Sequence, residues 1–237
     1  MNLILIHPSD LSNNDNTAVI SGRRFQHISD IHKAETGQTL KAGLLNGNKG
    51  QALVTQITDH SITLDLSLDT PPPQALPLKL LLALPRPKML KRTLQTISAM
   101  GVKEIYLMNS YRVDKSYWGS PIIQNQIEEQ LILGLEQAGD TILPELHFRK
   151  RFKPFIEDEL PEIAKDSRKL IAHPYNAAPC PTAEAAQTTL AIGPEGGFIP
   201  YEVEKMVEAG FQPIHIGERI LRVENAVPAL LSRLFPL

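Results

Sequence analysis

The chain has 237 residues, a formal net charge of −2, and 42% hydrophobic and 21% charged residues, which is enough apolar sequence for one large domain or two modest ones. Its single cysteine, Cys180, excludes an internal disulfide framework and fits a reducing compartment. The N-terminal apolar run is too short for a signal peptide, and no stretch approaches the ~20 apolar residues of a membrane span. We therefore expect a cytoplasmic protein without a membrane segment.

The first part of the chain predicts a small β-rich barrel over residues 1–70. Apolar residues alternate through 52–57 and 62–68 as they do in strands, and the sequence NGNKG at 46–50 supplies a hairpin turn. The proline-rich segment 71–77 then forms neither helix nor strand readily, and it predicts a stiff linker.

Strands alternate with helices after the linker, and this pattern predicts a parallel sheet with helices on both faces. The expected elements are a strand over 80–84, a helix ending at Gly101, a strand over 102–108, a helix over about 124–138, a strand beginning at Ile142–Leu143, a helical stretch near 155–165, and a strand over 169–172 that leads to His173.

The most informative stretch follows, where a buried strand over 188–192 runs into GPEGG at 193–197. This loop contains three glycines that are free to adopt positive φ. Pro200 can open the next helix and Gly210 can end it. The order of strand, glycine loop and helix is typical of a small-molecule site, although a tight connection would use similar residues.

A second glycine-broken strand exit lies within about thirty residues, the spacing of one βαβ unit. The strand over 214–216 leads to Gly217, and a closing helix contains Ala226 to Leu234. Ligands of open α/β sheets bind beyond the carboxyl ends of the strands, so we expect both loops to face one pocket. The loop lacks the Lys–Ser/Thr pair of a P-loop and the spacing of a dinucleotide motif. The seven scattered histidines indicate no metal site.

Basic residues concentrate in the middle of the chain, where residues 71–155 hold 12 Lys/Arg against 7 Asp/Glu. Such clusters can neutralise phosphates, or they can form ordinary solvated faces. One cluster follows the strand over 80–84, which makes it a candidate RNA contact. Its members are Arg86, Lys88, Lys91 and Arg92; the second cluster comprises Arg149, Lys150, Arg151 and Lys153.

The segments GPEGGF at 193–198 and IGERILRVENA at 216–226 closely resemble the SPOUT methyltransferases, specifically the RsmE family, which methylates N3 of a uridine in small-subunit (16S) ribosomal RNA. The resemblance implies an α/β fold in which a SPOUT-type parallel sheet with a C-terminal trefoil knot follows a small PUA-like β-barrel. We therefore expect an RNA-binding barrel over 1–70, a linker over 71–77 and a methyltransferase domain over 78–237. It also implies a homodimer, S-adenosylmethionine as cofactor, and ribosomal RNA or the small ribosomal subunit as partner.

The resemblance also assigns roles to residues. Arg222 is expected to stabilise charge on the uracil oxygens, and Glu224 to orient it or act as base; an ordinary ion pair between them is the alternative. Arg23 and Arg24 of the barrel are expected to contact RNA or simply to be exposed at a helix start, and Glu195 to cap backbone amides. No metal is needed, because the sulfonium already activates the methyl group. The expected cofactor-binding residues are His173, Ile192, Gly193, Pro194, Gly197, Ile216, Gly217, Ile220, Leu221 and Ala226.

Several positions depart from the family pattern. Asn225 stands where Thr is usual, Thr96 and Ala99 replace Lys and Glu, Asp140 replaces Arg, and His32–Lys33 replaces Leu–Arg. These changes touch the RNA side of the resemblance more than the cofactor side. A methyltransferase with another RNA acceptor and a non-catalytic RNA-binding or ribosome-assembly protein therefore remain open.

Overall fold

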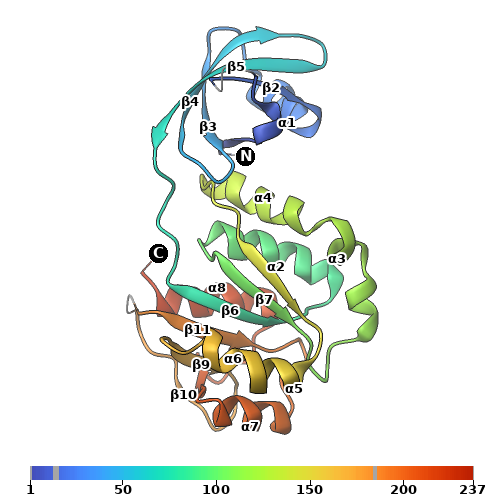
Figure 1. Ribbon diagram of the computed structural model, residues 1–237, viewed down its shortest axis with the longest axis vertical. Coiled ribbons are helices and arrows are strands. Elements are labelled where there is room, and N and C mark those ends of the chain that lie inside the picture. The colour runs from blue at the N-terminus through green and yellow to red at the C-terminus, as the bar shows by residue number, and fades with distance from the viewer. Residues whose placement is uncertain (1, 13–15, 184–185, 237) are drawn as a thin grey trace. The chain divides into compact units, whose positions relative to one another are not determined.

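The computed structural model describes residues 2–12, 16–183 and 186–236. Contacts divide the chain into two compact units (Figure 1). The first unit comprises residues 1–74 and 132–143, and the second comprises residues 75–131 and 144–237.

The first unit is built on a curled five-stranded sheet that forms a half-barrel. Its strand order is β1-β3-β4-β5-β2, and its neighbouring strands are antiparallel except for the parallel pair β1–β3. Two register shifts between β4 and β5 bend the sheet around an apolar core that includes Ile20, Val54 and Leu64. The predicted β-rich first part of the chain is confirmed. The strands are β1 Ile4–Ile6, β2 Thr17–Ser21, β3 Thr39–Leu44, β4 Lys49–Ile57 and β5 Ser61–Thr70.

Short helical segments complete this unit, together with the end of a longer helix. They are η1 Pro8–Asp10, α1 Gly22–His27, η2 Ile28–His32 and the final turns of α4 Ile127–Ala138.

Residues 132–143 belong to the first unit in the structure, although the family resemblance includes them in the methyltransferase domain over 78–237. The reason is apolar packing, because Ile132 and Leu135 of α4 are buried against Leu3 and Leu5. The strand expected to begin at Ile142–Leu143 is present, but it begins at Glu145 instead. The Asp140 carboxylate accepts the N–H of Ile142 at 3.0 Å, and the Asn46 side chain accepts the N–H of Leu143 at 2.9 Å, so these residues form a loop.

The second unit is an α/β domain whose seven-stranded sheet has the order β10-β12-β9-β11-β6-β7-β8, with every neighbouring pair parallel. The predicted parallel sheet is confirmed. The central strand β11 is buried along its whole length, including its two threonines, Thr188 and Thr189. The strands are β6 Leu78–Ala83, β7 Glu104–Met108, β8 Glu145–Arg149, β9 Arg168–Ala172, β10 Ala178–Pro179, β11 Thr188–Ile192 and β12 Gln212–His215.

Helices cover both faces of this sheet (Figure 1). The helices α2 and α8 pack against each other on one face, and α7 packs with η4 on the other. The predicted helix over about 124–138 is interrupted at Gln126, where φ is −124°. The remaining segments are α2 Pro87–Ala99, η3 Lys115–Gly119, α3 Pro121–Asn125, α5 Phe152–Pro154, η4 Phe155–Glu159, α6 Leu160–Ile163, α7 Pro200–Glu208 and α8 Val223–Leu234.

Because all seven strands run in one direction, the loops that leave their carboxyl ends gather along a single edge of the sheet. This edge carries both glycine loops as well as the basic residues after β6 and β8. Within the described ranges, no helix has the length and apolar character needed to cross a membrane.

Candidate functional site

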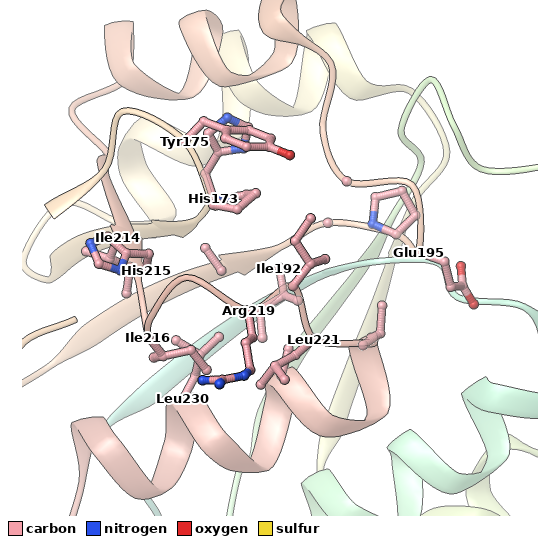
Figure 2. Close-up of a pocket in the computed structure, with 18 of the residues that line it drawn as sticks. His173, Tyr175, Ile192, Glu195, Ile214, His215, Ile216, Arg219, Leu221 and Leu230 are labelled. Carbon is pink, nitrogen blue, oxygen red and sulfur yellow. The ribbon is translucent and has the colours of Figure 1, made fainter. Parts of the chain in front are cut away.

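A cavity of about 450 Å³ opens at the carboxyl ends of β9, β11 and β12. Its size falls in the range of small-molecule sites. Figure 2 shows His173 and Tyr175 on one side of the cavity and Ile216, Leu221 and Leu230 on the other. The cavity therefore lies where the two glycine-broken strand exits predict a ligand site.

The ten residues that the family resemblance assigns to cofactor binding all line this one cavity. They are His173, Ile192, Gly193, Pro194, Gly197, Ile216, Gly217, Ile220, Leu221 and Ala226. Four further polar or aromatic residues line it as well, and the sequence did not single them out. They are Arg112, Tyr175, His215 and Arg219.

The first glycine loop has a conformation that larger residues cannot adopt. A Cβ at Gly193 would lie 3.1 Å from the backbone nitrogen of Phe198, and Gly197 has a φ of +71°. The N–H of Gly197 donates to the carbonyl of Pro194 at 2.7 Å, which closes the turn. The backbone of this loop is consequently the wall of the cavity, and its amides and carbonyls can approach a ligand closely.

Glu195 has the structural role that the sequence predicts. Its carboxylate accepts the backbone N–H of Arg86 at 3.0 Å and so ties the loop to the start of α2.

Arg112 crosses from the loop after β7 to the glycine loop. Its guanidinium donates to the carbonyl of Gly196 and also lines the cavity. A Cβ at Gly196 would lie 2.8 Å from Cδ of Arg112, so the glycine makes room for this side chain. No local pattern could identify Arg112, because only the strand order β11-β6-β7 brings it to a loop more than eighty residues away.

A buried carboxylate holds these loops in place. Glu202, which is 2% exposed, accepts hydrogen bonds from Ser110 Oγ at 3.0 Å, from the Tyr111 N–H at 2.8 Å and from the Ile199 N–H at 3.0 Å. Glu202 thus joins the loop that carries Arg112 to the first turn of α7.

The second glycine loop presents apolar side chains around the opening. Gly217 has a φ of +132°, and its N–H donates to Nδ1 of His215 at 3.1 Å. Ile220 is 71% exposed, and Ile216 and Leu221 are also exposed. Exposed apolar side chains at a cavity mouth favour an apolar ligand surface.

One face of α8 forms part of the cavity wall. Val223, Ala226 and Leu230 recur at positions i, i+3 and i+7, and all three line the cavity. Arg222 and Glu224 lie off this face and are not among the lining residues.

Arg222 and Glu224 nevertheless flank the site closely in sequence. Arg222 is exposed at the N-cap of α8. The Oε2 atom of Glu224 is buried and has no hydrogen-bond partner among the residues that the structure describes. Within that same part of the chain no ion pair joins the two side chains, so the structure offers no support for the ion-pair alternative.

His173 forms part of the cavity wall. It follows the last residue of β9, and its N–H donates to the carbonyl of Ile214 at 2.9 Å. Burial lowers the pKa of its imidazole below the ordinary 6.5. The ring also makes an edge-to-face contact with Tyr175, with centroids 5.9 Å apart.

The candidate RNA-contacting residues fall into two groups. Arg86, Lys88, Lys91 and Arg92 are all exposed at the start of α2, at the carboxyl end of β6. In the first unit, by contrast, both arginines are engaged in ion pairs.

Arg23 and Arg24 pair with different carboxylates. Arg24 pairs with Asp10 and also donates to the carbonyl of Leu5 at 2.8 Å. Arg23 pairs with the buried Glu136 at 3.2 Å but stays 45% exposed. Arg23 is therefore the more accessible of the two.

Comparisons with known proteins place this architecture in a family. A family model described as an RNA methyltransferase domain matches residues 72–235. The ribosomal RNA small subunit methyltransferase E of Treponema pallidum (strain Nichols) is 31% identical, over 97% of this chain and 88% of the relative. The chain belongs to the ribosomal RNA small subunit methyltransferase E family. A second member, from Mesomycoplasma hyopneumoniae (strain 232), is 29% identical over 65% of this chain and 67% of its own length.

Solved structures share the fold of the family along nearly the whole chain. The small subunit methyltransferase E of Neisseria gonorrhoeae, bound to S-adenosylmethionine, has a TM-score of 0.73 at 19% identity and covers 97% of this chain and 95% of its own. A Legionella pneumophila protein in complex with the same cofactor has a TM-score of 0.74 at 23% identity and covers 98% and 96%. The SPOUT-type assignment agrees with these likenesses, whereas the trefoil knot stays a prediction.

Proposed function

We propose that the chain is an S-adenosylmethionine-dependent methyltransferase that modifies N3 of a uridine in small-subunit ribosomal RNA. The observation that carries this proposal is the cavity at the carboxyl ends of β9, β11 and β12, walled by the backbone of two glycine loops. Family membership supports it, because the relatives are named as small-subunit ribosomal RNA methyltransferases.

The residues of the cavity fit S-adenosylmethionine. Ile192, Ile216 and Leu221 offer apolar surface for the adenine, and the amides and carbonyls of the two loops offer partners for its polar edge and for the ribose. When bound, S-adenosylmethionine supplies a methyl group that is activated by its sulfonium. Burial lowers the pKa of His173, which disfavours a protonated imidazole beside a cationic ligand.

Arg222 and Glu224 are assigned to the acceptor rather than to the cofactor, since neither lines the cavity. Deprotonation of uracil N3 leaves negative charge on the flanking carbonyl oxygens, which a guanidinium stabilises. Arg222 is proposed for that role. Glu224 is proposed to accept the N3 proton or to orient Arg222, and its buried Oε2 has an unused acceptor position in the described structure.

RNA docking is proposed for the exposed cations of α2, Arg86, Lys88, Lys91 and Arg92, which can neutralise phosphates near the cavity. In the first unit, Arg23 is the stronger candidate and Arg24 the weaker, because Arg24 is largely buried in its pair with Asp10. We propose that residues 1–70 bind RNA, that 71–77 act as a linker and that 78–237 carry the chemistry. A cytoplasmic homodimer is the proposed working form.

The test is methyl transfer from labelled S-adenosylmethionine to small ribosomal subunits that lack uridine N3 methylation, with the product nucleoside identified by mass spectrometry. N3-methyluridine is expected. A different labelled nucleoside would move the proposal to another RNA acceptor. Cofactor binding by calorimetry without any transfer would favour a non-catalytic RNA-binding or ribosome-assembly role.

A further inference from the structure

The second basic cluster, over residues 149–153, lies beside two aromatic side chains that the site described above does not use, the exposed Phe148 and the half-buried Trp118. Phe148 is the last residue but one of β8, the outermost strand, and is 40% exposed. Trp118 of η3 meets it edge to face, with ring centroids 6.2 Å apart at 71°. Lys150 Nζ lies 5.7 Å from the centroid of the Trp118 ring. We call Trp118, Phe148, Lys150 and Arg151 the edge platform.

The platform is held in place from below. The indole N–H of Trp118 donates to the side-chain oxygen of Asn109 at 3.0 Å. A surface hollow of about 260 Å³ adjoins Phe148, and Lys150 and Arg151 help to line it. The bond to Asn109 therefore orients the Trp118 ring, and Phe148 packs against that ring beside the hollow.

Two of the four cations in this cluster are already neutralised and two are not. Arg149 pairs with Glu159 at 2.6 Å, and Lys153 lies 3.9 Å from Glu157. Lys150 and Arg151 are exposed, and neither has a carboxylate partner in the part of the chain that the structure describes. These two cations are available to phosphates.

The platform and the cavity both lie at the carboxyl ends of the strands of this sheet. β8 is three strands away from β11 in the order β11-β6-β7-β8, and all four strands are parallel. Three steps of ~4.8 Å give a separation of roughly 14 Å along the edge. About four stacked nucleotides span that distance. Arg86 follows the end of β6, which lies between β11 and β8 in the sheet.

We propose that the edge platform binds the single-stranded flank of the acceptor RNA. Bases stack on Phe148 and Trp118, and Lys150 and Arg151 contact the intervening phosphates. Exposed aromatic faces beside unpaired cations are the combination that single-stranded RNA uses, whereas an acidic peptide requires only the cations. The inference rests on the proposed function for the identity of the RNA but not for the binding itself.

Trp118 makes a direct test possible, because it is the only tryptophan in the chain. Titration with a short single-stranded oligouridylate is expected to quench its fluorescence saturably. Phe148→Ala is expected to weaken binding by roughly 5- to 150-fold, the effect of losing one stacked base. The double variant Lys150→Ala/Arg151→Ala is expected to reduce the slope of log K against log salt by about 1.4, because two phosphate contacts are lost.

Lys165→Ala is the matched control. Lys165 is exposed and lies in the loop ahead of β9, at the amino ends of the parallel strands and away from the platform. Its removal is therefore expected to change neither the affinity nor the salt slope. Absence of quenching in the wild type, or equal weakening by Lys165→Ala, overturns the platform. Equal quenching by polyglutamate also overturns it, since the surface would then recognise acidic polypeptides.

A second measurement separates this inference from the proposed function. Transfer to small subunits is expected to show a raised KM and an unchanged kcat in Lys150→Ala/Arg151→Ala. Quenching without any methyl transfer supports the platform and rejects the proposed activity. Normal transfer with an unaltered KM in the double variant rejects the platform and leaves the activity intact.

Discussion

Glu202 offers the sharpest test of how the loops around the cavity are held. Its buried carboxylate accepts three hydrogen bonds, from Ser110, Tyr111 and Ile199, and thereby joins two loops that are far apart in sequence. Glu202→Ala removes both acceptor oxygens, and with them all three hydrogen bonds, and leaves the three donors behind.

The magnitude follows from the surroundings of each donor. A hydrogen bond to a charged acceptor contributes about 1.5–3 kcal/mol, which sets an upper range of ~4.5–9 kcal/mol for three. The amides of Tyr111 and Ile199 are only partly buried and can regain water, whereas the Ser110 hydroxyl cannot. We therefore expect the free energy of unfolding to fall by about 3–4 kcal/mol.

Urea unfolding followed by Trp118 fluorescence measures this loss. Trp118 and Glu202 lie in the same unit, so the signal reports the unit that is perturbed. With a slope of ~2 kcal/mol per molar urea, the midpoint should drop by roughly 1.5–2 M. Glu204→Ala is the control, because Glu204 is exposed on the same helix and should change stability by no more than ~0.5 kcal/mol. If Glu202→Ala cost no more than Glu204→Ala, the three bonds would not be what holds the loops.

Three further predictions concern the cavity wall and its neighbours. Gly193→Ala should weaken S-adenosylmethionine binding by roughly 5- to 150-fold in calorimetry, because the new Cβ meets the Phe198 backbone. Gly119→Ala is the control and should leave the affinity unchanged, because open space surrounds Gly119. Equal affinities of the two variants would contradict this prediction. Because burial lowers the pKa of His173, the unfolded chain binds the proton more readily; the stability from this residue is complete above pH 6.5 and is lost as pH falls through the folded-state pKa. The free energy of unfolding, measured from about pH 5 to about pH 8, should depend less steeply on pH in His173→Gln than in the wild type. An unchanged pH dependence would exclude His173 as its source. Burial also raises the pKa of the Cys180 thiol, so iodoacetamide should label Cys180 in urea but not in the folded protein, and rapid labelling of the folded protein would show an accessible thiolate.

The elements that the sequence predicts well are those whose cause is local. The strand over 188–192 combines two β-branched threonines with the apolar residues Leu190, Ala191 and Ile192 and is ended by a glycine, and the structure has β11 over Thr188–Ile192. Pro200 opens α7, and Gly210 follows its end with a φ of +90°. Because parallel strands bring their carboxyl ends to one edge, the cavity-lining role of both glycine loops also followed from the order of elements.

What the sequence could not predict depends on contacts between distant segments. Arg112 reaches the cavity only because β7 lies two strands from β11, and Arg112 belongs to no motif. Residues 132–143 join the first unit because Ile132 and Leu135 pack on Leu3 and Leu5, which helical periodicity alone cannot reveal. The strand expected to begin at Ile142–Leu143 begins at Glu145, because the side chains of Asp140 and Asn46 accept the backbone N–H groups of Ile142 and Leu143.

Substitution of Glu224 is expected to raise the stability of the free protein and to lower its methyl transfer activity. Its Oε2 is buried without a hydrogen-bond partner in the described structure, an arrangement that costs free energy unless a ligand supplies the donor. Glu224→Gln replaces the carboxylate by a neutral group of the same shape, so the free protein should gain up to about 1 kcal/mol of stability. If this oxygen takes the N3 proton of the uracil, methyl transfer by Glu224→Gln should fall by roughly 10²- to 10⁴-fold. The affinity for S-adenosylmethionine should be retained, since Glu224 does not line the cavity. Urea unfolding, calorimetry and single-turnover transfer on the same preparation distinguish the outcomes. A variant that is less stable and fully active would make Glu224 a structural residue of α8, and the unpartnered oxygen would then need a donor from within the protein.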